Sequence, residues 1–96
     1  MDLNDFENFL EFTKKQIEIL KIKEISYKDT WKTNDISIIN KFMDSQIDRL
    51  SALIKRIEEA RPLMIKNQYH NIERAKDALL DIANYAFFLY QRLGDI

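Results

Sequence analysis

The last third of the chain constrains the fold most, because residues 73–90 form a segment with the apolar spacing of a helix. Apolar residues recur there at alternating three- and four-residue steps, at Ile72, Ala75, Leu79, Ile82, Ala86, Leu89 and Leu93. Further aromatic and aliphatic residues make the segment apolar on nearly every side, which is typical of a buried helix. A chain of 96 residues forms only a modest core. We therefore expect a second subunit to cover part of this helix.

Three polar side chains interrupt this helix along a single line. At about 100° per residue, Asp77, Asp81 and Asn84 lie together, opposite the main apolar stripe. Because burying an unpaired carboxylate is costly, these groups need a cation, a hydrogen-bond network or a water-filled cleft. Asp77 also fits a first-turn carboxylate favoured by the helix dipole, and Asn84 fits a bond to a neighbouring helix end. Asp81 is the strongest candidate for a function, as a ligand or as the partner of a lysine or arginine across a dimer.

The rest of the chain predicts further helices and no sheet. One glycine and one proline leave little turn chemistry for a β fold, and Pro62 should end a helix. We expect helices over about residues 2–25, 35–60 and 71–93, with short links that make them antiparallel neighbours. The sequence predicts a single all-α domain, an antiparallel helical hairpin or bundle of three main helices that completes a four-helix-like bundle by oligomerisation. The second and third helices should form most of the subunit interface.

A second acidic line is expected on the helix over residues 35–60. Its members share the flank beside the apolar stripe: Asp44, Asp48, Ser51, Lys55 and Glu58. A turn near Lys66 would place Asp77 at the height of Lys55 and Asn84 at the height of Asp48. Carboxylates on facing helices make a hard-oxygen site suited to Mg²⁺ or Mn²⁺, which would hold the phosphates of a nucleotide and activate a water. Asp48, Asp77 and Asp81 are the predicted metal ligands, although Asp44 and Asp48 also fit a solvated helix face.

Three blocks carry a resemblance to a known family: Tyr27-Lys-Asp29-Thr-Trp31, Ser45-Gln-Ile-Asp-Arg49-Leu-Ser-Ala-Leu53 and Asp77-Ala-Leu-Leu-Asp81-Ile-Ala-Asn84-Tyr85. They resemble the MazG-like, nucleotide-modification-associated proteins, a group of the all-α nucleoside triphosphate pyrophosphohydrolases. The chain departs from that pattern at Lys28, where the family has glycine, and at Ser45-Gln46, where it has Asp-Lys. The paired-glutamate motif Glu-x-x-Glu of the wider superfamily is absent in its usual form.

The resemblance implies a helical dimer or tetramer that splits a nucleoside or deoxynucleoside triphosphate into monophosphate and pyrophosphate with Mg²⁺. Asp77 and Asp81 are then the candidate catalytic residues. The candidate contacts to the nucleotide are Asn84, Lys55, Arg49 and Trp31. Surface ion pairing is an alternative for the two basic residues, and a core anchor is an alternative for the tryptophan.

Composition narrows the remaining function classes. The net charge of −1 provides no strong field towards nucleic acid or anionic lipid, so nucleic acid and membrane are not expected as partners. The chain has no cysteine and an acidic N-terminus without an apolar signal region, which predicts a cytoplasmic protein. Two alternatives to the hydrolase stay open: a catalytically degenerate helical dimerisation or regulatory module, and a small nucleic-acid-binding protein. A four-carboxylate cluster favours the hydrolase, whereas an Asp81 paired with Lys or Arg favours the degenerate module.

Overall fold

The computed structural model describes residues 1–27, 29–59 and 65–96, with the side chains of 25–27 and 65–67 left aside. Four helices follow one another in these residues: α1 (Leu3–Tyr27), α2 (Thr30–Thr33), α3 (Ile36–Glu59) and α4 (Ile65–Gly94). The described part of the chain contains no strand, so the prediction of an all-α fold is confirmed. The short helix α2 was not expected from the sequence.

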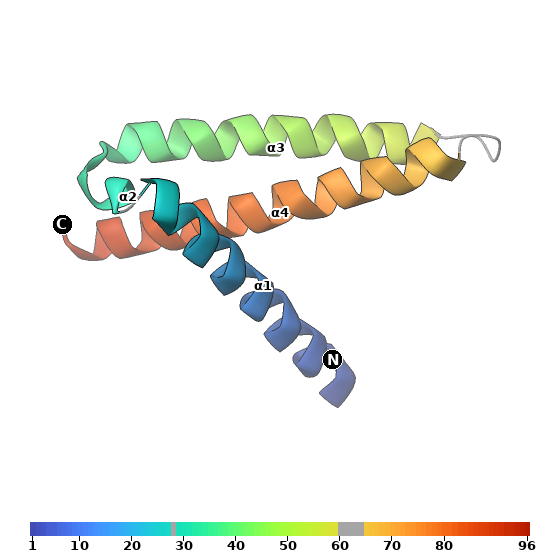
Figure 1. Cartoon of the computed structure of the whole chain (residues 1–96), viewed down its shortest axis with the longest axis horizontal. Coiled ribbons are helices and arrows are strands. Elements are labelled where there is room, and N and C mark those ends of the chain that lie inside the picture. The colour runs from blue at the N-terminus through green and yellow to red at the C-terminus, as the bar shows by residue number, and fades with distance from the viewer. Residues whose placement is uncertain (28, 60–64) are drawn as a thin grey trace.

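Helices α3 and α4 form a long antiparallel hairpin (Figure 1). Asp35 begins α3, since its carbonyl accepts hydrogen bonds from the backbone N–H groups of Ile38 and Ile39 at 3.0 and 3.3 Å. Among the described residues, the buried apolar side chains are few: Ile39, Leu53, Ala75, Ala78 and Leu80. Two of these five side chains are alanines, which bring the helix axes close together but bury little apolar area.

The start of α4 corrects the expected register of the hairpin. α4 begins at Ile65 instead of near residue 71, so Lys66 lies within the helix and the expected turn at this residue is wrong. The reason is that residues 65–71 contain no helix-breaking glycine or proline, so the helix extends towards the link. Residues 60–64, which include Pro62, lie outside the described residues.

Two contacts fix the actual register. The Gln68 side-chain amide donates a hydrogen bond to the Ile57 carbonyl at 2.8 Å, and the Phe42 and Tyr85 rings lie 6.1 Å apart. Because the helices are antiparallel, each step forward on α4 matches one step back on α3. Residue 77 then lies level with residues 48–50, and residue 81 with residues 44–46.

Helix α1 crosses α4 with its C-terminal half and then projects away from the hairpin (Figure 1). Its first turn is stabilised by reciprocal hydrogen bonds, from the Asp2 N–H to the Asp5 carboxylate at 2.9 Å and from the Asp5 N–H to the Asp2 carboxylate at 3.0 Å. Gln16 and Lys23 make its polar contacts to α4. We call residues 3–17 of α1 the arm.

Helix α2 is a single turn that is tied to the C-terminal part of α4. The Arg92 guanidinium donates hydrogen bonds to the backbone carbonyls of Trp31, at 2.8 Å, and Asn34. The Trp31 ring stacks on Phe88 with 4.8 Å between centroids and 14° between planes. These contacts fix α2 beside the end of the hairpin at which α3 begins and α4 ends (Figure 1).

Two leucines of the expected buried stripe are not covered in the single chain. Leu79 is 45% exposed and Leu93 is 58% exposed, because α4 turns its alanine-containing face towards α3 instead. None of the helices, over the residues described, has a stretch long and apolar enough to cross a membrane.

Candidate functional site

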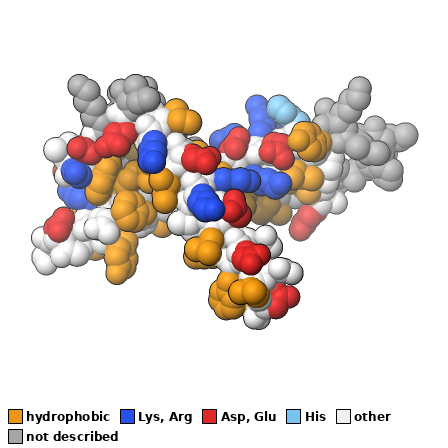
Figure 2. Space-filling model, turned by 60° about the horizontal axis from the view of Figure 1, so that its bottom comes forward, with side chains coloured by type: hydrophobic (Ala, Val, Ile, Leu, Met, Phe, Trp, Pro, Cys, Tyr) orange, Lys and Arg blue, Asp and Glu red, His pale blue; other side chains and the backbone are white. Residues whose placement is uncertain are grey.

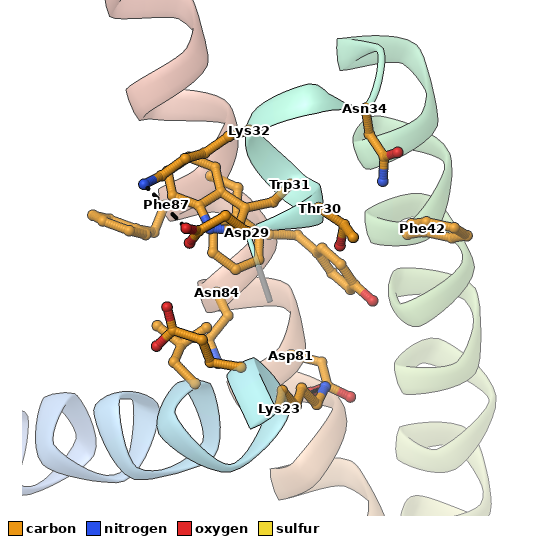
Figure 3. A pocket seen from close by; sticks show the side chains of 14 residues that line it. Lys23, Asp29, Thr30, Trp31, Lys32, Asn34, Phe42, Asp81, Asn84 and Phe87 are labelled. Carbon is orange, nitrogen blue, oxygen red and sulfur yellow. Dashed lines mark hydrogen bonds and ion pairs between the residues drawn. The ribbon is translucent and has the colours of Figure 1, made fainter. Parts of the chain in front are cut away.

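A cleft of about 570 Å³ lies where α1 and α2 approach the C-terminal half of α4 and the first turns of α3 (Figure 3). Residues from all four helices line it: Leu20, Lys23, Glu24, Asp29, Thr30, Trp31, Lys32, Asn34, Phe42, Asp81, Asn84, Tyr85, Phe87 and Phe88. Its walls are largely aromatic and its ionisable groups come from three separate helix segments. This combination is typical of a small-molecule site, with apolar walls and a few converging polar groups.

The aromatic wall is built around α4. Trp31 from α2 stacks on Phe88 and lies 6.2 Å from Phe87 at a tilt of 53°. Phe42 from α3 approaches Tyr85 from the other side. In Figure 3 the Trp31 and Phe42 side chains stand on different helices on the two sides of the cleft. The rings therefore line the cleft with apolar surface, in which only Trp31 and Phe88 are nearly parallel.

Asn84 is the most unusual polar group of the cleft, because it is only 4% exposed. Its side-chain oxygen accepts a hydrogen bond from the Gln16 amide of α1 at 3.4 Å. Its Nδ2 group has no hydrogen-bond partner among the described residues. A buried donor without an acceptor costs about 1–3 kcal/mol, and such a group in a native structure calls for an explanation. Asn84 lines the cleft, but Nδ2 itself has less than 1 Å² of accessible surface, so an acceptor bound in the cleft reaches it only if the side-chain amide rotates.

Asp81 lies one turn before Asn84 and forms an ion pair within the chain. Its carboxylate is 2.8 Å from the Lys23 ammonium of α1, and the side chains are 20% and 44% exposed, respectively (Figure 3). The pair holds the end of α1 against α4 at the edge of the cleft. Asp81 thus has the lysine partner that the sequence predicted as one of two possibilities, although the lysine comes from its own chain.

A second, looser ion pair lies on α2. The Lys32 ammonium is 3.7 Å from the Asp29 carboxylate and 5.6 Å from the centre of the Trp31 ring. Both charged side chains are more than half exposed. Lys32 and Lys23 therefore place two cations at the edge of the aromatic wall.

The predicted metal ligands do not gather in the single chain. Asp48 and Asp77 are exposed, whereas Asp81 turns towards α1. Among the described residues, no group of three or more Asp, Glu or His side chains is placed to hold a metal ion. The reason is the position of α1, which crosses α4 at Asp81 and Asn84 and leaves Asp77, one turn earlier, in solvent. Binding of Mg²⁺ or Mn²⁺ stays a prediction.

Some of the residues predicted to contact the nucleotide line the cleft, and others lie outside it. Trp31, Asp81 and Asn84 line it together. Arg49 and Lys55 are exposed on α3 outside the cleft, and Arg49 donates to the Gln46 side chain of its own helix at 3.3 Å.

Sequence reasoning missed the two lysines of the cleft, Lys23 and Lys32, and Phe42. The path of α1 across α4 is what brings Lys23 to Asp81. One sequence signal could have identified Lys23. Gln16 and Lys23 lie two turns apart on the same face of α1, and this face carries polar groups that match two polar residues on α4, Asn84 and Asp81.

Comparison of the chain with models of protein families, with curated proteins and with solved structures gives no match. The resemblance of the three sequence blocks therefore stays a prediction.

Proposed function

We propose that the chain binds a nucleotide in the cleft formed by its four helices. The observation that carries this proposal is the buried Nδ2 donor of Asn84, which has no partner among the described residues. A ligand that brings an acceptor to this donor removes the cost of leaving it unpaired. The carbonyl oxygens and ring nitrogens of a nucleobase are acceptors of this kind.

The walls of the cleft support a flat heterocyclic ligand. Trp31, Phe42 and Phe88 supply aromatic surface, and stacking of a base on an aromatic side chain contributes about 1–3 kcal/mol. The cleft volume of about 570 Å³ falls within the range of roughly 300–1,000 Å³ for small-molecule sites. A base with its sugar fits these dimensions.

The lysines support an anionic group on the same ligand. Lys23 and Lys32 line the cleft, and each is paired with a carboxylate in a partly exposed ion pair. Such pairs contribute little to stability because both charges are solvated. A phosphate group, with its higher charge, therefore competes well for the two lysines.

The ion pair between Asp81 and Lys23 favours binding without hydrolysis. A carboxylate that is neutralised by a lysine at 2.8 Å is not poised as a metal ligand. This favours a catalytically degenerate relative of the pyrophosphohydrolases that binds a nucleotide for a regulatory purpose.

Mg²⁺-dependent hydrolysis is the second candidate, because Glu24, Asp29 and Asp81 all line the cleft. Mg²⁺ is often held by one or two carboxylates together with the phosphates of the substrate, so a bound triphosphate would supply the missing ligands. Asp81, released from Lys23 by the phosphates, would be the first protein ligand. When bound, Mg²⁺ would supply charge stabilisation at the phosphates and an activated water.

The nucleic-acid alternative receives less support. Figure 2 shows basic and acidic side chains interspersed over the visible face, without a broad basic surface on it. A polyanion binds best to a continuous row of positive charge. Salt-sensitive binding to DNA or RNA remains the observation that would favour this class.

Fluorescence of Trp31 tests nucleotide binding directly, because it is the only tryptophan in the sequence and lines the cleft. We expect a saturable change of emission on titration with at least one of a panel of ribo- and deoxynucleoside mono- and triphosphates, with and without Mg²⁺. Asn84→Asp replaces the donor by an acceptor of the same shape, and we expect it to weaken binding about tenfold or more. Lys76→Gln, on an exposed part of α4 outside the cleft, is the matched control and should bind like the parent.

Absence of a fluorescence change with the whole panel, or equal affinities of the parent and Asn84→Asp, would refute the nucleotide cleft. Release of pyrophosphate in the presence of Mg²⁺ would decide for the hydrolase, and binding without release would decide for the regulatory module.

We also propose that the protein is a homo-oligomer, a dimer or a tetramer. The apolar side chains that remain exposed on the single chain, including Leu79 and Leu93, support this.

A further inference from the structure

The single chain exposes far more surface than a protein of its size normally does. Its accessible surface is 7807 Å², whereas a compact protein of 11.5 kDa exposes about 5,800 Å². Its radius of gyration is 15.7 Å, against about 12.5 Å for a compact chain of this length. The excess of about 2,000 Å² is more than the roughly 800 Å² that each partner contributes to a standard interface. The arm of α1, which stands away from the hairpin, is a major source of this excess (Figure 1).

The arm has a second apolar face in addition to the one that touches α4. Phe12, Gln16, Ile19 and Leu20 are half-buried and define the inner face of α1, of which the arm carries the first two residues. Leu3, Phe6, Leu10 and Ile17 lie about a third of a turn away, and all four are exposed. We call these four residues the outer stripe. Figure 2 shows hydrophobic side chains gathered on the arm where it projects from the body.

The outer stripe has the spacing of a coiled-coil seam. Its residues, with Thr13 between Leu10 and Ile17, follow steps of three and four residues. Phe9, which is 62% exposed, widens the seam at its N-terminal half. Such a seam is stabilised when it packs against a second helix.

The charges of α1 indicate which helix this is. Its N-terminal part is acidic, with Asp2, Asp5, Glu7 and Glu11. Its C-terminal part is basic, with Lys14, Lys15, Lys21 and Lys23 against the two acids Glu18 and Glu24. Two copies of this helix placed antiparallel bring the acidic part of each against the basic part of the other, whereas a parallel pair places like charges side by side.

We propose that the arm pairs with the arm of a second copy of this chain in an antiparallel coiled coil centred near Leu10. In this arrangement Leu3 packs near the partner's Ile17, and the reverse contact follows by two-fold symmetry. Glu7 and Lys14 flank the stripe on the same side, so each Glu7 faces the partner's Lys14. This places a subunit interface on α1, in addition to the one that the sequence predicts on the two hairpin helices.

Sedimentation at micromolar concentration tests the pairing. We expect a dimer, and we expect Leu10→Glu to raise its dissociation constant about a hundredfold, because the change introduces a charge at the centre of the seam on both copies. Asn8→Glu introduces the same charge on the opposite face of the arm and should leave the dimer intact. Circular dichroism should show equal helix content in both variants, since Leu10 and Asn8 are exposed in the single chain.

A charge exchange tests the proposed ion pairs. Glu7→Lys should weaken the dimer by placing two lysines together at each end of the seam, and the double variant Glu7→Lys with Lys14→Glu should restore it.

Introduced cysteines test the orientation, because the chain has none of its own. Under oxidation, the double variant Leu3→Cys with Ile17→Cys should form a covalent dimer, and Leu3→Cys alone should not. The two positions lie about 21 Å apart along one helix, too far to bridge within a chain.

Three results would overturn the proposal. These are a monomer at all concentrations, a dimer that Leu10→Glu leaves intact, and efficient cross-linking of Leu3→Cys alone, which indicates parallel arms. Failure of the charge exchange to restore the dimer would remove the register near Leu10. None of these results depends on nucleotide binding, so they are independent of the function proposed for the cleft.

Discussion

Neutralising Asp81 tests how α1 is held against the hairpin. The Asp81 carboxylate and the Lys23 ammonium, 2.8 Å apart, form the one ion pair between α1 and α4 in the described part of the chain. The substitution Asp81→Asn keeps the shape of the side chain and removes its charge. It therefore isolates the ion pair from the packing around it.

The exposed fractions of the two side chains set the expected magnitude. Breaking a fully buried ion pair costs about 3–5 kcal/mol, because a charge is left without a partner. An exposed pair contributes about 0.2–1 kcal/mol. Asp81 is 20% exposed and Lys23 is 44% exposed, so the lysine regains water when its partner is lost. We expect Asp81→Asn to lower the free energy of unfolding by about 1 kcal/mol, which for a chain of this size shifts Tm by about 4–8 °C.

A double-mutant cycle measures this contribution. Thermal unfolding of the parent, Asp81→Asn, Lys23→Gln and the double variant, at one protein concentration, should give a coupling energy of about 0.5–1 kcal/mol that decreases in high salt. Asp77→Asn, exposed one turn earlier on α4, is the control and should leave Tm unchanged. A coupling energy of zero, or an Asp81→Asn variant more stable than the parent, would refute the reasoning. A parent whose Tm rises with Mg²⁺, a rise that Asp81→Asn abolishes, would identify Asp81 as a metal ligand.

Two further perturbations test the packing around the cleft. Arg92→Met removes the hydrogen bonds to the Trp31 and Asn34 carbonyls, each of which contributes about 1.5 kcal/mol or more. We therefore expect α2 to detach and the fluorescence emission of Trp31 to shift to the red. Arg74→Met, at an exposed position on the same helix, is the control and should leave the emission unchanged. Leu53→Ala should cost about 2–5 kcal/mol in urea unfolding because this side chain is 3% exposed, whereas an equal loss for Ile54→Ala, 43% exposed, would contradict the assignment of the core.

The helices were predictable because their signals are local. The three- and four-residue steps of α3 and α4 are visible in the sequence, and Asp35 stands at the expected start of α3. The turn Thr30–Thr33 gave no such signal, because a single turn has no period. It is held in place by Arg92, which is separated from it by most of the chain. Contacts of this kind depend on the tertiary arrangement and leave no local pattern.

Site residues could be predicted from the sequence only where a polar side chain stands in an otherwise apolar helix. Asp81 and Asn84 are polar in an apolar segment, and both line the cleft. Asp48 and Asp77 give no such signal, because both side chains are exposed. The observed register makes residue 77 level with residues 48–50, but the two exposed carboxylates form no metal site with the other described residues. Lys23 was not predicted, because a lysine among other charged residues on a helix gives no local sign of its tertiary partner. It reaches Asp81 only because α1 crosses α4.

Helix α1 links the two proposals, because its inner face closes the cleft and its outer face is free for a partner. Gln16 and Lys23 reach Asn84 and Asp81 of α4, which line the cleft, while the adjacent outer stripe is exposed in the single chain. The contacts of α1 to α4 are few and partly exposed, so within one chain they hold the helix weakly. A second copy that packs on the arm would stabilise α1 as a whole and with it the wall of the cleft. By linkage, a ligand bound against Asn84 and Lys23 would in turn stabilise the paired arms.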